Sequence, residues 1–462
     1  MLDKNLINEV IKVGLSTGAD FAEVFIERKK YSAISMLDNH VSNIADSLIC
    51  GLGLRLYKGF ESVYSSTSDL SRTSIIKTAE QTARMIKSKN LDLINPAYLH
   101  ERINLNINRI KTVPSSATNK EKLEILKTAY FAAKNYDSVI SQVSGTFLDE
   151  DRTFWVANSN GLYTSDRQIR CRLMIESVAT KNGENQTGGA RPGARKGLEL
   201  FTEEIDPTEV GREASRVAKI NVNSDYLKAG VMPVAIENGF GGVIFHESCG
   251  HSLEATSVAA GASQMAGKLG QKIANSKLTA IDDGTIPNAW GSYNIDDEGR
   301  PAQKNVLIEK GILKSYMVDT LNSRKMKCEP TGNARRESFN YEPTSRMTNT
   351  YIAPGNDDDK DIISSIEDGL YCAKMGGGSV NPVTGAFNFA VLEGYKIHNG
   401  EIGESVRGAS LIGTGSQIIQ DIDMIGKYMK FGQGMCGSSS GMVPANVGQP
   451  LVRVKKITVG GR

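Results

Sequence analysis

The stretch Gly239-Phe-Gly-Gly-Val-Ile-Phe-His-Glu-Ser-Cys-Gly-His251 carries two of the five histidines in this chain of 462 residues. Imidazole nitrogen is a good zinc ligand, and a carboxylate beside a metal-bound water can accept its proton. His246, Glu247 and His251 therefore indicate a metal-dependent hydrolase centre, on a helix that a glycine-rich turn introduces. A buried helix with two ordinary histidines is the competing interpretation, because short motifs also match by chance.

The two histidines are five residues apart, one more than in the familiar helical zinc motif. At 3.6 residues per turn, this spacing separates the two side chains by roughly 140° around a helix. A regular helix cannot easily present both rings to one ion. We therefore expect a widened, π-type turn across residues 248–250, which are small enough to permit it.

A third protein ligand must complete the centre, since catalytic zinc usually has three and keeps a fourth position for water. Glu254 lies three residues beyond His251 and on the same helical face, so it could bind directly. Cys436 is distant in sequence, in a glycine-flanked loop over residues 432–440. Cys249 lies between the histidines, and its side chain is expected to point away from the face that they share. Spacing alone does not choose between Glu254 and Cys436.

The composition is that of a soluble globular protein long enough for two or three domains, with 40% hydrophobic and 23% charged residues. The net charge is only +2 and the basic residues are scattered, so we expect neither nucleic acid nor a membrane as partner. The six cysteines lie far apart, which favours reduced thiols over a disulfide framework. With no signal peptide or membrane-spanning run, the sequence predicts a cytoplasmic protein.

Helical and alternating periodicities mix in the first half, which predicts an N-terminal α+β domain over residues 1–224, with a division near 91–118 as the alternative. Antiparallel hairpins are expected to be covered by helices. The expected helices are 2–15, 71–87, 120–134 and 207–220. The expected strands are 21–27, 31–37, 51–57, 62–65 and several within 138–180. Residues 91–118 have little pattern and predict a linker, and the Gly-, Asn- and Arg-rich run 181–196 predicts a mobile loop.

The second half, residues 225–462, is dense in glycine and in short apolar strands. Glycine at strand corners is typical of sheets that bend strongly or close on themselves. We therefore expect a strongly bent or barrel-like antiparallel sheet that carries the metal-site helix, in a C-terminal metallopeptidase domain. The clearest strands are 231–236, 305–308, 312–318, 387–395 and 451–459, and the acidic run 357–360 is expected to begin a solvated helix.

Several segments in order along the chain resemble the TldD/PmbA family of metallopeptidases, historically called modulators of DNA gyrase. They are Gly242 to Glu254, Asp283 to Gly299, Thr331 to Ser338, Arg346 to Thr350, Gly376 to Pro382, Met435 to Gly437 and Ile457 to Gly461. The amino-terminal half is similar more loosely, chiefly through Gly51-Leu-Gly-Leu-Arg-Leu56. Together these segments cover most of the chain, so chance similarity is not a reasonable explanation.

The resemblance implies a TldD-type catalytic subunit of the HExxxH type, with one Zn²⁺ per catalytic subunit. Carried over residue by residue, the ligands are His246, His251 and Cys436, and Glu247 is the base that activates water. The resemblance also implies cleavage of small or unfolded polypeptides. The implied partner is a sister subunit that lacks the metal motif, or a second copy in a homodimer.

Other residues are open to a functional or a purely structural interpretation. Arg335, Arg336 and Tyr341 are candidates for stabilising the oxyanion, and Trp290 for lining the site, but packing or surface roles are equally compatible with the sequence. His40, His100 and His398 stand alone and are expected to be surface or ordinary core residues. The alternative function is a non-catalytic, protein-binding regulator of the gyrase-modulator type, which would not require an intact metal triad.

Overall fold

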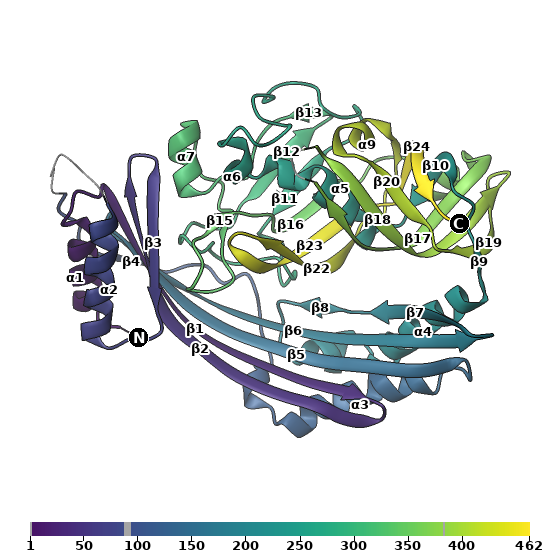
Figure 1. The fold of residues 1–462 in the computed structure, drawn as a ribbon, viewed down its shortest axis with the longest axis horizontal. Coiled ribbons are helices and arrows are strands. Elements are labelled where there is room, and N and C mark those ends of the chain that lie inside the picture. The colour runs from purple at the N-terminus through teal and green to yellow at the C-terminus, as the bar shows by residue number, and fades with distance from the viewer. Residues whose placement is uncertain (1, 87–93, 382–383) are drawn as a thin grey trace.

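The computed structural model describes residues 2–86, 94–381 and 384–462. The chain has an α+β fold in which a long, curved sheet lies beneath a second, glycine-rich half (Figure 1). The helices of the first half are α1 (Lys4–Leu15), α2 (Arg72–Met85), α3 (Asn119–Lys134) and α4 (Pro207–Asn223), with short turns at Pro114–Ser116 and Leu200–Glu204. Its strands are β1 (Phe21–Leu37), β2 (His40–Lys58), β3 (Glu61–Thr67), β4 (His100–Arg102), β5 (Ile140–Asn158), β6 (Leu162–Lys181), β7 (Glu184–Ala190) and β8 (Gly193–Ala194).

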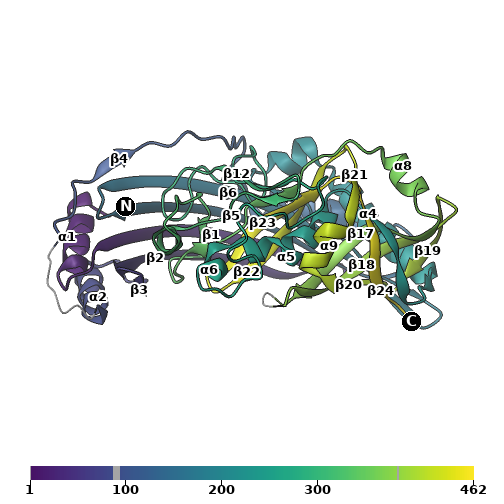
Figure 2. The same ribbon diagram turned by 90° about the horizontal axis from the view of Figure 1, so that it is seen from above.

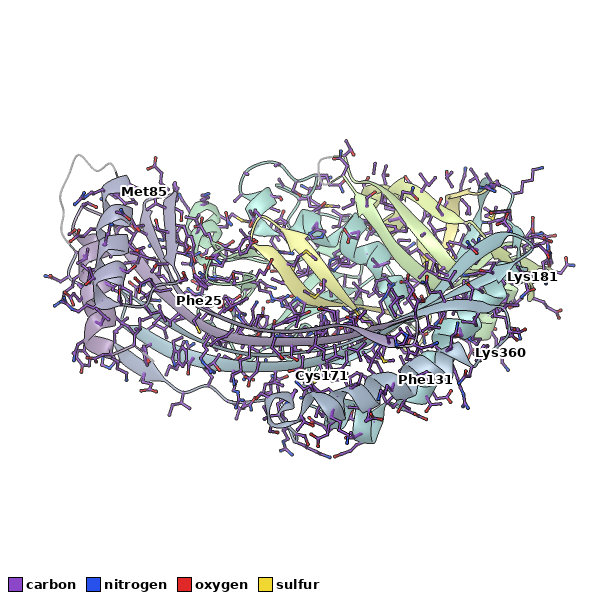
Figure 3. The ribbon with its side chains drawn as sticks, turned by 60° about the horizontal axis from the view of Figure 1, so that its bottom comes forward. Phe25, Met85, Phe131, Cys171, Lys181 and Lys360 are labelled. Atoms are coloured by element: carbon purple, nitrogen blue, oxygen red, sulfur yellow. The ribbon has the colours of Figure 1, made fainter. Side chains whose placement is uncertain are left out.

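The first sheet has the strand order β3-β2-β1-β5-β6-β4, and β7 and β8 also pair with β6. Its four long strands are antiparallel neighbours that run side by side along the molecule, as the view from above shows (Figure 2). Helices α1 and α2 bury apolar faces at one end of these strands, and α3 and α4 cover the other end. Figure 3 shows α3, with Phe131, beneath the strand that carries Cys171. The predicted hairpins covered by helices are therefore confirmed.

The helices of the second half are α5 (Val243–Ser248), α6 (Ala255–Val258), α7 (Thr320–Met326), α8 (Asp359–Ser364) and α9 (Gly415–Asp421), with 3-10 turns η3 (Phe240–Gly242) and η4 (Gly250–Leu253). The strands up to the middle of this half are β9 (Asp225–Tyr226), β10 (Gly230–Ile236), β11 (Ala280–Asp283), β12 (Lys304–Glu309), β13 (Ile312–Leu313), β14 (Ala334–Arg335), β15 (Thr344–Ser345) and β16 (Asn349–Ile352). The remaining strands are β17 (Asp368–Val380), β18 (Ala386–His398), β19 (Glu401–Arg407), β20 (Ser410–Thr414), β21 (Ile422–Ile425), β22 (Lys430–Ser438), β23 (Gly441–Gln449) and β24 (Val452–Gly460).

A closed sheet confirms the expected barrel-like architecture of this half. Strands follow one another as β17-β10-β24-β20-β18, and β18 pairs back to β17. The pair β10–β17 is parallel, whereas the other pairs of this ring are antiparallel. A separate six-stranded sheet has the order β13-β12-β11-β16-β23-β22, so that β22 is an edge strand. Helix α5 packs its residues Val243, Ile244 and Phe245 into the core that the two sheets share.

Some predicted boundaries differ from the structure for identifiable reasons. The predicted strands 21–27 and 31–37 are one continuous strand β1. The predicted mobile loop 181–196 is wrong, because most of it forms β7 and β8 against β6. Glycine allows β7 to approach α4 closely, because a Cβ on Gly188 would lie 2.3 Å from the carbonyl oxygen of Ala214 in α4. The acidic run does begin a helix, since Asp358 caps α8.

Two predictions extend into parts of the chain that the structure does not describe. The predicted helix 71–87 is confirmed as α2 up to Met85, and Lys87 lies outside the described residues. The first residues of the predicted linker 91–118, residues 91–93, also lie outside them. The rest of that segment contains β4 and one short turn. Of the helices in the described ranges, none combines the length and the apolar character needed to cross a bilayer.

Candidate metal centre

Close backbone packing fixes the position of the helix that carries the first histidine. The chain turns at Gly239, whose φ of 91° lies in the region that glycine adopts without strain. Helix α5 then begins against β23, because a Cβ on Gly242 would lie 2.5 Å from the backbone of Gly448. His246 follows on the last turn of α5 and is 3% exposed. The glycine-rich turn seen in the sequence is therefore what lets the histidine helix approach the strand.

The prediction of a π-type turn between the histidines is wrong. The helix is nevertheless distorted there, as expected, and the distortion brings the two rings together. Helix α5 ends at Ser248, and Cys249 leaves helical geometry with φ −130° and ψ −40°. A 3-10 helix then carries His251. Gly250, the next residue, lets the chain pack closely against Met347, because a Cβ there would lie 2.3 Å from the Met347 sulfur. A kink of one residue, in place of a widened turn, brings both rings to one side.

Three side chains meet at this break. The Nε2 atom of His246 lies 3.3 Å from the Cys436 sulfur, and the Nε2 atom of His251 lies 3.5 Å from it. The two imidazole rings are 5.1 Å apart and nearly perpendicular, at 84°. All three ligand atoms lie within 4.8 Å of one another. Among the described residues this is the one group of three or more such side chains that could hold a metal ion.

The spacing of the donor atoms fits zinc. With Zn–S near 2.3 Å, Zn–N near 2.05 Å and tetrahedral angles, sulfur and nitrogen ligands lie about 3.5 Å apart. The two sulfur-to-nitrogen distances match this value. Burial alone would raise the pKa of the Cys436 thiol, but the two histidines outweigh burial and lower it to about 3. The thiolate, which is the form that binds metals, is therefore favoured.

Several contacts fix the position of Cys436 on strand β22. Cys436 lies opposite Val443 of β23, and both belong to a small apolar cluster. Its carbonyl oxygen accepts a hydrogen bond of 2.5 Å from the guanidinium of Arg346, which is fully buried. Two residues earlier, the carbonyl of Gly434 accepts a hydrogen bond of 2.8 Å from the indole of Trp290. Trp290 thus helps to hold the cysteine strand, a supporting role that its place in a glycine-rich segment did not reveal.

Glu254, the alternative third ligand, lies outside the cluster of ligand atoms. Its Oε2 is 3.1 Å from Nδ1 of His251, and its Oε1 accepts a hydrogen bond from the backbone N–H of Met347. A carboxylate at Nδ1 keeps the proton on that nitrogen and leaves Nε2 free to bind an ion. Burial lowers the pKa of His251, but Glu254 and Cys436 outweigh burial and raise it well above its usual value.

Glu247 follows His246 directly and stays close to the ligand atoms. Its Oε2 lies 3.6 Å from Nε2 of His251, and a quarter of its side chain is exposed. A carboxylate at this position can exchange protons with a small molecule held near both Nε2 atoms. Cys249, by contrast, is fully buried in the apolar core, where burial raises the pKa of its thiol to about 12.

The other candidates bind structural partners. Arg336 is buried, and its guanidinium lies 3.0 Å from Glu23 of β1, so it links the two halves of the chain. Arg335 is also buried and donates to the carbonyl of Met347. The carbonyl of Tyr341 lies 3.5 Å from the Arg336 guanidinium. Three histidines are exposed on the surface, namely His40, His100 and His398.

Comparisons with known proteins identify the family of this chain. Three consecutive domain families match the chain: PmbA/TldA metallopeptidase domain 1 over residues 22–86, the central domain over 113–222 and the C-terminal domain over 229–461. A metalloprotease TldD homolog from Haemophilus influenzae is 33% identical over 453 residues, covering 96% of this chain and 93% of that protein. A zinc metalloprotease TldD homolog from Saccharolobus solfataricus is 34% identical over 237 residues, covering 51% and 52%.

Solved structures share the fold. A protein from Thermotoga maritima, described as a candidate modulator of a DNA gyrase, has a TM-score of 0.80 at 19% identity and covers 99% of this chain and 100% of its own. TldE from Thermococcus kodakarensis has a TM-score of 0.76 at 20% identity, with coverage of 99% and 100%. These structures establish the architecture, and the sequence relatives establish the family. This chain is a member of the PmbA/TldD family of metallopeptidases.

Proposed function

We propose that this chain is a zinc-dependent peptidase that hydrolyses peptide bonds in small or unfolded polypeptides. One zinc ion per chain would be held by His246, His251 and Cys436. The observation that carries the proposal is the convergence of these three donor atoms, with both sulfur-to-nitrogen distances near the value for a tetrahedral zinc site. A non-catalytic regulator would have no need of such an arrangement.

Two carboxylates would have separate roles, Glu247 in proton transfer and Glu254 in keeping His251 in one tautomer. A zinc ion at this site would polarise the scissile carbonyl and bring the pKa of a water molecule down to about 7. The Glu247 carboxylate then accepts a proton from the attacking water and later delivers it to the leaving amine. Glu254 keeps a proton on Nδ1 of His251, so that Nε2 keeps its lone pair.

Strand β22 offers a backbone edge next to the proposed metal site. The N–H of Asn446 in β23 donates to Thr348 on the β16 side, so the odd-numbered residues of β23 face β22. Because these pair with the even-numbered residues of β22, the N–H and C=O groups of Met435 and Gly437 face the free edge. A substrate strand that pairs there would bind through its backbone, with little preference for side chains.

A second subunit would complete the enzyme, either a sister subunit that lacks the metal motif or another copy of this chain. Large apolar side chains support such a contact: Tyr98, Ile103 and Leu105 are 78%, 90% and 82% exposed. Enclosure of the site between two subunits would exclude folded proteins by size. A cytoplasmic location agrees with the six free cysteines.

Peptide cleavage by a Glu247→Gln variant tests the proposal. This variant should retain zinc and lose about 10²- to 10⁴-fold in the rate of hydrolysis of an unstructured peptide, because the proton acceptor is gone. Glu309→Gln, at an exposed glutamate of β12, is the matched control and should behave like the wild type. Full cleavage activity in the zinc-loaded Glu247→Gln protein would disprove the assignment.

A further inference from the structure

Residues 101–109 form a surface ridge in which the usual alternation of a strand is inverted. The segment reads Glu-Arg-Ile-Asn-Leu-Asn-Ile-Asn-Arg and continues from β4 along the edge of the first sheet without a helix or turn (Figure 2). The side-chain amides of Asn104 and Asn108 donate hydrogen bonds of 2.6 Å and 3.0 Å to neighbouring segments of the protein. Ile103 and Leu105, which alternate with them, are 90% and 82% exposed. An apolar ridge held from behind by bonded polar side chains is typical of a surface that a partner covers.

The backbone of this ridge is unpaired as well. The N–H and C=O groups of residues 103–106 form no hydrogen bond within the described ranges of the chain. Strand β4, from which the ridge continues, is the terminal strand of its sheet. The segment contains neither proline nor lysine, the residues that commonly protect an exposed edge. Apolar side chains beside free backbone groups offer what a strand of a partner would bind.

The ridge is complementary to itself when its direction is reversed. If two copies meet as antiparallel strands about a two-fold axis at Leu105, this residue lies opposite Leu105 of the second copy. Each Ile103 then lies opposite Ile107 of the second copy, because the two are equally far from the axis. All three apolar positions are therefore paired with apolar positions.

Charges at the two ends of the ridge favour the same arrangement. The antiparallel pairing places Glu101 opposite Arg109 of the second copy at both ends, and opposite charges across a strand pair are stabilising. Arg109 is exposed and forms no ion pair among the described residues, whereas Glu101 lies 2.8 Å from Lys4. A parallel pairing would instead place each of these charges opposite its own kind.

We propose that two copies of this chain associate through residues 101–109, as an antiparallel pair centred on Leu105. The inference rests on the second subunit of the proposed function, which it identifies at this surface as another copy of the chain. It needs neither metal nor substrate, so it can be tested separately from peptide cleavage.

A cysteine placed on the two-fold axis tests the pairing directly. Residues directly opposite in antiparallel strands have Cα atoms about 4.5–5.5 Å apart, within the range that a disulfide spans. Full-length Leu105→Cys should therefore form a covalent dimer on mild oxidation, visible by electrophoresis without reductant. Tyr428→Cys, at a residue that is 67% exposed, is the matched control and should stay largely uncrosslinked. Equal crosslinking of Leu105→Cys and Tyr428→Cys would overturn the proposal.

Charge reversal tests the register of the pair. Sedimentation equilibrium of the full-length protein gives the Kd of the dimer. Glu101→Arg or Arg109→Glu alone should weaken the dimer about tenfold, because like charges then face each other at both ends. The double variant should recover most of the wild-type affinity, and Glu401→Arg, at an exposed site of β19, should not change it. A double variant that is weaker than both single variants would contradict this register.

Leu105→Asp tests whether the ridge is an interface at all. It places two carboxylates on the axis and should weaken the dimer about 100-fold. Because Leu105 is exposed, the Tm of the isolated chain should stay the same. Unchanged affinity in this variant would overturn the contact and leave the second subunit bound at another surface. A wild type that is monomeric would also overturn it, and would leave the sister subunit as the proposed partner.

Discussion

Oε2 of Glu254 lies 3.1 Å from Nδ1 of His251, while Nε2 of the same ring lies 3.5 Å from the sulfur of Cys436. Two residues that compete in the sequence for one role therefore occupy different places around one imidazole. The Glu254 carboxylate fixes the proton on Nδ1 of His251. The Cys436 thiolate lies beside Nε2, whose lone pair remains available for a metal ion. The geometry favours Cys436 as the third ligand and Glu254 as a residue that positions His251.

Replacement of Glu254 by glutamine tests this division. The amide can still accept a hydrogen bond from Nδ1–H but no longer carries the charge that favours this tautomer. Zinc should remain bound, with an affinity about tenfold weaker than that of the wild type, as for other supporting carboxylates. Competition with a chromophoric chelator measures the affinity, and Glu309→Gln is the control. Complete loss of zinc from Glu254→Gln would show instead that Glu254 binds the ion directly.

Replacement of Cys436 by alanine should have the larger effect. It removes the one sulfur donor of the cluster, so zinc should be absent from the purified protein. With cobalt in place of zinc, the wild type should show thiolate-to-metal charge-transfer absorption that the variant lacks. Cys249→Ala is the matched control, since that thiol is buried in the apolar core. A Cys436→Ala protein with full metal content and unchanged spectra would rule out sulfur ligation.

Buried charges connect the first sheet to the second half, and their removal should destabilise the fold. Glu23 lies 2.9 Å from Arg55 and 3.0 Å from Arg336, and Arg55 also lies 2.6 Å from Glu298, all of them almost fully buried. Glu23→Gln leaves two buried guanidinium groups with less counter-charge. The free energy of unfolding in urea should fall by about 3–5 kcal/mol.

An exposed ion pair serves as the control for this experiment. Glu101 lies 2.8 Å from Lys4, and both side chains are about half-exposed. Glu101→Gln should leave the free energy of unfolding close to that of the wild type, because solvent screens such pairs. Equal small losses in Glu23→Gln and Glu101→Gln would mean that the buried network does not stabilise the contact between the two halves.

The sequence predicts those parts of the fold whose periodicity reflects burial. Helix α1 packs its apolar face on one end of β1 and helix α3 packs its apolar face on the other end, in two separate cores, so the positions of both helices follow from the spacing of their apolar residues. The outer part of β2 could not be predicted in this way, because residues 40–47 lie on a sheet edge and, apart from the half-buried Ala45, are exposed. The glycines of β7 suggest a loop when the sequence is read alone, and the close approach of α4 explains one of them, Gly188.

The metal centre, like the fold, could be predicted only in part from the sequence. His246 and His251 are recognisable from local spacing, and so is the need for a distortion between them. Its actual form, a break at Cys249, depends on Gly250 packing against Met347, which lies far away in sequence. The choice of Cys436 came from family resemblance, because no local pattern in the sequence connects this cysteine with the two histidines.

Glu237, at the end of β10, should make stability depend on pH. Its Oε1 accepts a hydrogen bond of 2.6 Å from the N–H of Met375, but burial outweighs this bond and raises its pKa from 4.5 to about 7. The folded protein therefore holds a proton that the unfolded chain releases above pH 4.5. Its contribution to stability is complete below that pH and is lost as pH rises through 7.

Glu237→Gln should flatten the fall in Tm between pH 5 and 8, whereas Glu401→Gln, at an exposed site, should not. The same slope in Glu237→Gln and wild type would place the responsible proton on another group.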